Sequence, residues 1–379
     1  MRFLPAFCCV SAAAVMSLSL PVCAETVETD DIAQLTEQLY IESGADELIG
    51  GVPGEALPIL DALGFTGFGA GGTDGISPGG VVSALSDAVK ENMREPVRVL
   101  CCLAGIVILA AALEAVKSGG AADSALSLVS SLCAVSVVAP PILSLTGELT
   151  ETICASSSFM LLYVPVISGL MTASGHPASG TMYAGVMIWL SGAVLQLASR
   201  LVVPLLKCVM SLSVVSAAGE TVRFDGVADI FRRAARFILT FCMSIFAAFL
   251  TMRTIVSAAA DSLTNRAVRF AVGSFVPVVG GALSDAYQTV VACVSLLKSG
   301  VGAAAIAAVF AIFVPVAVRC VLWQAVCTAG AALCGVFGVS RVSSLLSSLS
   351  SVVSVMFAVL LCTMVIYIIS TAILLIVGG

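Results

Sequence analysis

The stretch DSLTNRAVRFAVGSFVPVVGGALSDAYQTVVACVSLLK, residues 261–298, decides how the second half of the chain is organised. It interrupts a series of apolar segments, and between its charged residues it contains Pro277 and three glycines. At membrane depth such a break is tolerated only where protein or a water-filled cavity satisfies the freed backbone groups. We therefore expect a re-entrant or interfacial hairpin that serves assembly or conduction. The residues expected to shape it are Arg266, Arg269, Pro277, Gly280, Gly281 and Asp285.

The segments on either side of this stretch indicate an all-α, polytopic integral membrane protein. Apolar residues make up 59% of the chain and charged residues 11%, against about 25% charged residues in soluble domains. A helix needs about 20 apolar residues to cross the bilayer, and residues 96–379 contain enough such segments for eight or nine transmembrane helices. The expected spans are Val99–Val116, Ala125–Leu145, Ile153–Ala173, Met182–Ala217 with a possible split near Arg200, Phe237–Val256, Val301–Val318, Val321–Phe337 and Val352–Val377.

The first 95 residues differ from this membrane domain. Residues 1–24 are typical of a secretory signal peptide cleaved after Ala24, and an uncleaved anchor is the main alternative. Residues 25–95 carry fourteen acidic residues against two basic ones, whereas the chain from Pro96 onward carries nine against fourteen. Their glycine-rich part, Gly64–Gly80, predicts a flexible linker, and we expect little of residues 25–95 to bury a core. We expect residues 25–95 to form an acidic, partly flexible extracytoplasmic region.

Arginines predict which loop faces the cytoplasm. Residues 219–236 contain Arg223, Arg232, Arg233 and Arg236, and short loops rich in Lys and Arg lie on the cytoplasmic side. If the N-terminus is external, five membrane crossings also place this loop on the cytoplasmic side. Beyond residue 256 the basic residues are spread too evenly to fix the topology.

Two charged residues inside an apolar segment are further candidate site residues. Arg200 and Lys207 are seven residues apart and share one face if the helix continues past Pro204. Charged residues within membrane helices are costly and usually functional. They are expected either to line a polar interior or to mark a break at the level of the membrane surface.

Catalytic and metal-binding patterns are missing from the sequence. There is one histidine, His176, without an accompanying protease motif, and no HExxH or CxxC pattern occurs. Cys320, Cys327 and Cys334 recur every seven residues, which favours helix packing by small residues over a redox stripe. We expect no enzymatic activity, no cofactor, no metal and no nucleic-acid partner.

Two segments carry a resemblance to a known family. LTNRAVRFAVGSFVPVVGGALSDAYQTVVACVSLLKSGVG resembles the most characteristic segment of the stage III sporulation protein AE family, and ASGHPASGTMYAG is similar to a weaker signature. The order of parts, with a signal sequence, an extracytoplasmic region and a polytopic body, is also similar.

The resemblance implies a protein of the mother-cell membrane around the forespore. It also implies a secretion-like channel, or feeding tube, formed with ring-forming and other membrane proteins of the same operon, a secretion-type ATPase and stage II sporulation protein Q. The competing hypotheses are a stand-alone secondary transporter with a midplane site and a purely structural membrane scaffold. The cargo, the stoichiometry and whether this chain lines a pore stay open at this point.

Overall fold

A computed structural model describes residues 37–69, 72, 75, 78–115, 121–174, 177–218, separate positions between 230 and 248, and residues 280–377. All regular structure in these ranges is helical. After a helical turn at residues 37–42, the elements are η1 (Ala45–Gly51), α3 (Leu57–Ala62), α4 (Pro78–Asn92), α5 (Arg94–Ala115), α6 (Ala121–Ala173), α7 (Pro177–Leu197), the π-helical turn η2 (Ala198–Val202), α8 (Val203–Ala218), α10 (Gly280–Val336) and α11 (Ser340–Val377).

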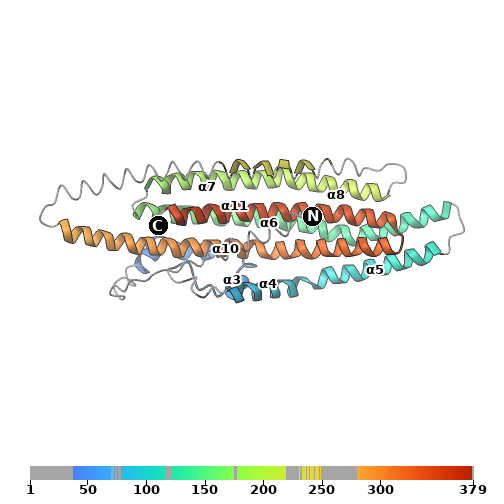
Figure 1. The fold of residues 1–379 in the computed structure, drawn as a ribbon, viewed down its shortest axis with the longest axis horizontal. Helices are drawn as coiled ribbons and strands as arrows, with labels where there is room; N and C mark the ends of the chain where they lie inside the picture. Colours follow the sequence, from blue (N-terminus) through green and yellow to red (C-terminus); the bar gives the residue numbers. More distant parts are fainter. Residues whose placement is uncertain are drawn as a thin grey trace.

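The long helices form an elongated bundle in which α10 and α11 are central (Figure 1). In their most apolar windows 78% and 67% of residues are buried, against 28–35% in the other membrane-length helices. The bundle has two ends. At the proximal end α6 finishes and α7 and α10 begin; at the distal end α5, α8 and α10 finish and α6 and α11 begin (Figure 1).

The described residues contain five helical segments that are long and apolar enough to cross a membrane: Arg94–Leu113, Leu128–Ala173, Pro177–Val215, Ala292–Val336 and Ser340–Ala372. They do not confirm the expected count of eight or nine crossings. One helix, α6, contains both Ala125–Leu145 and Ile153–Ala173, and α10 contains the two segments on either side of Arg319. Charged residues lower the local hydropathy there, but a charged side chain does not interrupt a helix. The expected signal peptide lies outside the described residues.

The turn between the two central helices has a simple physical cause. Gly338 follows α10 with a φ of 79°, a left-handed conformation that costs glycine little. The amide of Val339 donates a hydrogen bond to the carbonyl of Cys334 at 3.0 Å, so one of the last free carbonyls of α10 is satisfied. The chain can therefore reverse within a few residues and pack α11 along α10.

Gly330 makes a close approach between three helices possible. A Cβ atom there would collide with Leu103 of α5 and lie 3.1 Å from Leu346 of α11, whereas a Cβ at Gly105 would meet nothing within 4 Å. We expect Gly330→Ala to lower the unfolding free energy by about 1–2 kcal/mol, because overpacking exceeds the gain in helix propensity. Gly105→Ala is the matched control and should be neutral or stabilising. Thermal unfolding of both variants in detergent tests this, and equal melting temperatures would contradict it.

The N-terminal region is packed onto the bundle, so the prediction that it buries little core is wrong. We call residues 37–69 with Gly72 and Gly75 the head. Its apolar side chains, such as Leu48, Leu60 and Phe68, are buried. The Phe68 ring lies 6.1 Å from that of Phe159 on α6, measured between centroids. The described part of the glycine-rich stretch therefore contains a folded loop rather than a flexible linker.

The glycines of this loop serve close backbone approach. Gly64 has a φ of 80°, and a Cβ there would lie 2.5 Å from the carbonyl oxygen of Gly75. Only glycine fits such a contact without displacement of the backbone. The sequence pattern that indicates flexibility thus also permits the tight loop that carries Phe68 to α6.

Tyr40 makes the packing of the head dependent on pH. Burial raises the pKa of its phenol, the negative charge of Asp46 raises it further, and a hydrogen bond with the backbone of Phe68 lowers it. Because the folded pKa exceeds the unfolded value of about 10, the stabilisation is complete below about pH 10 and is lost as the pH rises through the folded pKa. Unfolding curves between about pH 8 and 11 should show this loss in the wild type and a smaller loss in Tyr40→Phe. An unchanged pH dependence in the variant would contradict it.

Candidate functional site: a polar belt in the middle of the bundle

Three polar residues from distant parts of the chain meet about midway along the length of the bundle. Arg319 of α10 places Nη1 2.8 Å from Oε2 of Glu148 on α6. Its Nε donates a hydrogen bond to Oδ1 of Asn92, at the end of α4, at 2.7 Å. We call Asn92, Glu148 and Arg319 the polar belt. It joins α4, α6 and α10 at one level of the bundle.

The surroundings of the belt hold its side chains in place, but solvent screens its ion pair. The side chains of Arg319 and Glu148 retain 36% and 29% of their exposure, so solvent screening reduces the pair energy below that of a buried pair. Asn92 is also held in place, because its Nδ2 donates to the carbonyl of Ala88 at 2.8 Å. The belt therefore fixes the register of three helices and keeps two charges at the bundle surface.

Arg200, which follows α7, lies at the same height along the bundle axis as Glu148. Ser157 of α6 donates a hydrogen bond to the carbonyl of Ser191 on α7 at 3.3 Å, which sets the register of these antiparallel helices. Glu148 is nine residues before Ser157, and Arg200 is nine residues after Ser191. Both positions are therefore about 14 Å along the axis from that contact.

The candidate site residues Arg200 and Lys207 lie on the outside of the bundle. Arg200 belongs to η2, where the helix changes from α to π geometry, and Lys207 belongs to α8. Both residues are exposed. In this placement neither residue lines a polar interior of the bundle.

Part of the expected hairpin lies outside the described residues. Arg266, Arg269 and Pro277 are in that part; His176, elsewhere in the chain, also lies outside the described residues. Gly280, Gly281 and Asp285 lie in the first turns of α10, which continues without interruption past residue 298. The described part of the stretch 261–298 is therefore helical, and Lys298 at its end is buried.

Buried hydroxyl groups form a second polar feature, between α6, α7 and α11. The Tyr367 hydroxyl lies near the hydroxyls of Ser156, Ser157 and Ser191. Ser370 also donates to the sulfur of Met187 at 2.7 Å. Small hydroxyl-bearing residues let helices approach closely and add polar contacts between them. This cluster lies where α7 packs on α6 and touches α11.

The sequence alone did not identify the belt. Glu148 and Arg319 are 171 positions apart, and neither is part of a recognisable motif. Their only signal is that each is a charged residue between two apolar segments. Within the described residues no three His, Cys, Asp or Glu side chains converge in a way that could hold a metal ion. The belt offers charge pairing and a fixed helix register.

Comparison with known proteins supplies the family. The family model described as stage III sporulation protein AE matches residues 67–378. The stage III sporulation protein AE of Bacillus subtilis (strain 168) is 27% identical over 230 residues, which cover 61% of this chain and 58% of that relative. No solved structure gives a significant match. Since the family model covers most of the chain, including every membrane-length helix described above, the chain belongs to the stage III sporulation protein AE family.

Proposed function

We propose that this protein is a non-enzymatic membrane component of a multiprotein transport complex required for spore development. The observation that carries the proposal is the family match over residues 67–378, which supports a role in sporulation. Five membrane-length helices support placement in a membrane. In this role the protein is a multi-pass component of the mother-cell membrane around the forespore and contributes to a secretion-like channel.

The form of the bundle is compatible with work inside a larger assembly. The central helices α10 and α11 are surrounded by helices whose outer faces retain large exposed apolar side chains, among them Ile108, Leu132 and Trp189. Such faces fit lipid or neighbouring membrane proteins. The proposed protein partners are the ring-forming and other membrane proteins of the same operon, a secretion-type ATPase and stage II sporulation protein Q.

Affinity purification from sporulating cells tests the proposal. A tagged copy of the protein should co-purify with membrane and ring proteins made during sporulation, and with little else from vegetative cells that express the same tagged copy. Purified protein that transports a small solute in liposomes without partners would instead support a stand-alone transporter. Absence of any sporulation-specific partner after crosslinking would contradict the proposal.

A further inference from the structure

The polar belt divides the bundle into two apolar halves, each about as long as a bilayer is thick. The distal half includes Ala125–Gly147 of α6 and Cys320–Val336 of α10, and neither range contains a charged residue. At about 1.5 Å per residue these ranges measure roughly 35 and 26 Å, close to the hydrocarbon thickness of about 30 Å. The proximal half lies between the belt and Lys298 and is similarly apolar. Helices α6 and α10 are therefore too long to lie across one bilayer along their whole length.

The head excludes lipid from one face of the proximal half. Phe68 packs on Phe159, and the backbone at Gly51 lies against Leu162. Both contacts are near the middle of the proximal half of α6, ten or more residues beyond Glu148. The head also exposes acidic residues: Glu37, Glu42, Asp46, Glu47, Glu55 and Asp61. Ionised carboxylates at this level are incompatible with hydrocarbon.

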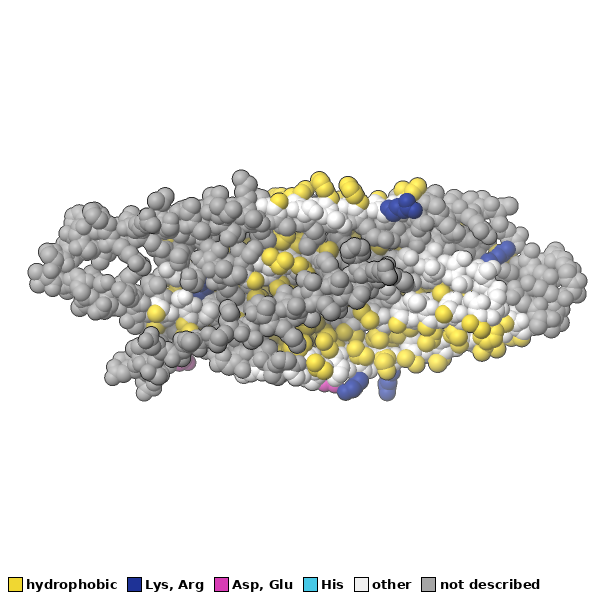
Figure 2. All heavy atoms as spheres, viewed as in Figure 1, with side chains coloured by type: hydrophobic (Ala, Val, Ile, Leu, Met, Phe, Trp, Pro, Cys, Tyr) yellow, Lys and Arg dark blue, Asp and Glu magenta, His cyan; other side chains and the backbone are white. Residues whose placement is uncertain are grey.

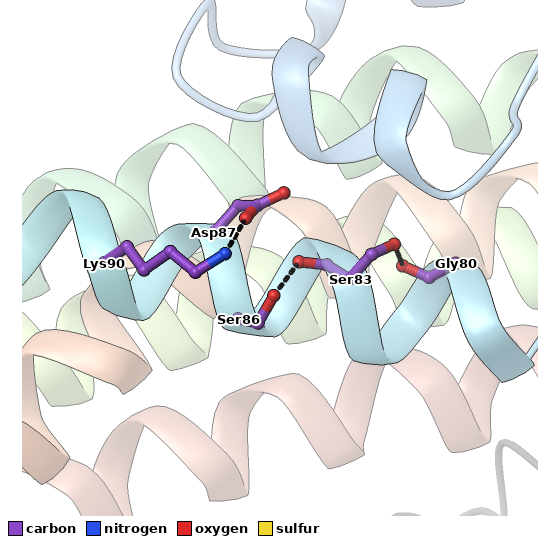
Figure 3. Close-up of polar contacts among 5 residues, drawn as sticks. All are labelled: Gly80, Ser83, Ser86, Asp87 and Lys90. Carbon is purple, nitrogen blue, oxygen red and sulfur yellow. Dashed lines mark hydrogen bonds and ion pairs between the residues drawn. The ribbon is translucent and has the colours of Figure 1, made fainter.

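Helix α4 also indicates that part of the surface of the proximal half is in contact with water. Its Ala84 and Ala88 are buried, whereas its exposed residues include the polar Ser83, Ser86, Asp87 and Lys90 (Figure 3) beside Val82 and Leu85. Lys90 lies 2.9 Å from Asp87, and both side chains are about two-thirds exposed or more. Since α4 packs beside α10 and ends at Asn92 of the belt, the surface on this side of the belt is adapted to water.

The distal half lacks the acidic head that covers part of the proximal half, although both halves expose large apolar side chains, Leu162, Ile188 and Trp189 among those of the proximal half. Large apolar side chains such as Ile108, Leu109, Val129 and Leu132 are at least half exposed there. Hydrophobic atoms gather along the side of the molecule where α5 lies (Figures 1 and 2). An apolar surface of bilayer height, bounded at one end by a polar belt, fits the hydrocarbon of a membrane.

The distribution of basic residues agrees with this placement. The sequence that follows α8, a helix that ends at the distal end, contains Arg223, Arg232, Arg233 and Arg236, and Arg341 lies in the first turn of α11 at that end (Figure 1). The chain between residues 25 and 89 contains acidic residues and no Lys or Arg. Dense arginine clusters in short loops mark the cytoplasmic side. The distal end therefore faces the cytoplasm, and the head lies on the opposite side.

We propose that only the distal half of the bundle is embedded in the bilayer, that the polar belt lies at its outer surface, and that the proximal half with the head stands outside the hydrocarbon. Each long helix then crosses the membrane once. Arg200 in η2 lies at the surface together with the belt, and the exposed Lys207, seven residues further along, reaches the same surface with its long side chain. The proximal half becomes a platform about 30 Å tall that protein partners can reach from outside the cytoplasm.

Two native cysteines on the same helix test this placement. Cys133 and Cys154 are both exposed on α6, the first in the distal half and the second six residues beyond Glu148. Single-cysteine proteins, with the other thirteen of the fourteen cysteines replaced, are reconstituted into liposomes and treated with a charged maleimide. We expect Cys154 to react at least about tenfold faster than Cys133, because a thiolate does not form in hydrocarbon. In SDS both should react equally. Equal rates in liposomes, whether fast or slow, would overturn the proposal.

Tryptophan fluorescence tests the same placement without removing cysteines. The chain has two tryptophans: Trp189 is exposed on α7 in the proximal half, and Trp323 is buried. In Trp323→Phe, brominated lipids should leave the emission of Trp189 nearly unchanged. In Trp189→Phe/Trp323→Phe/Leu132→Trp they should quench most of the emission. Strong quenching of Trp189 would overturn the proposal.

Discussion

Phe159→Ala should release the head from the bundle and lower the unfolding free energy by about 3–5 kcal/mol, the range for removal of a buried aromatic ring. Phe159 is fully buried, and its ring lies between Phe68 of the head, at 6.1 Å, and Tyr163 of the same helix, at 6.3 Å. Its removal leaves a cavity at the contact that attaches the head. The measurement is limited proteolysis in detergent, which should cleave the head far faster in the variant.

Leu161→Ala is the matched control for this experiment. Leu161 lies on the same helix but is 46% exposed, so its truncation should change stability by well under about 1 kcal/mol. The proteolysis rate of this variant should equal that of the wild type. If Phe159→Ala also left the head protected, the packing of the head on α6 would not be the contact that holds it.

Arg319→Glu should have the second largest effect, because it replaces an attraction with a repulsion in the middle of the bundle. The variant places a carboxylate beside Glu148 and removes the donor to Asn92. Loss of a buried pair costs about 3–5 kcal/mol; with side chains about one-third exposed, we expect a loss of about 2 kcal/mol in unfolding free energy. Thermal unfolding in detergent measures it.

Glu148→Arg combined with Arg319→Glu separates the charge effect from a change in size. The double variant restores opposite charges at the same level and should recover about half or more of the lost stability, since coupling between contacting residues is typically 0.5–3 kcal/mol. A second control, Glu151→Arg with Arg319→Glu, introduces the same charge one turn away and should recover less. Equal recovery by both pairs would mean that net charge, rather than the Glu148–Arg319 contact, sets the stability.

The fold class could be predicted from the sequence because apolar composition and segment length depend on local residues. The all-helical architecture and the membrane-length helices follow from these features. The number of helices does not follow, because it depends on whether a charged position ends a helix. At Glu148 and Arg319 the two charges satisfy one another, so α6 and α10 continue through positions where a hydropathy profile places a boundary.

The packing of the head could not be predicted for a related reason. Glycine-rich sequence indicates freedom of the backbone, and Phe68 is an isolated aromatic residue within it. Its partner Phe159 is 91 positions away, in a segment that reads as a lipid-facing span. Only the tertiary structure shows that this part of α6 faces protein, so the proposed bilayer surrounds the distal half instead.

Spore counts test the central claim most directly. In the bacterium that carries the gene, heat-resistant spores are counted after deletion of the gene and after complementation with the wild type, with Arg319→Glu, or with Arg319→Glu/Glu148→Arg. We predict that deletion removes heat-resistant spores, that the wild type restores them, that Arg319→Glu does not, and that the double variant restores most of them. Normal numbers of heat-resistant spores in the deletion strain would contradict a required role of this membrane protein in spore development.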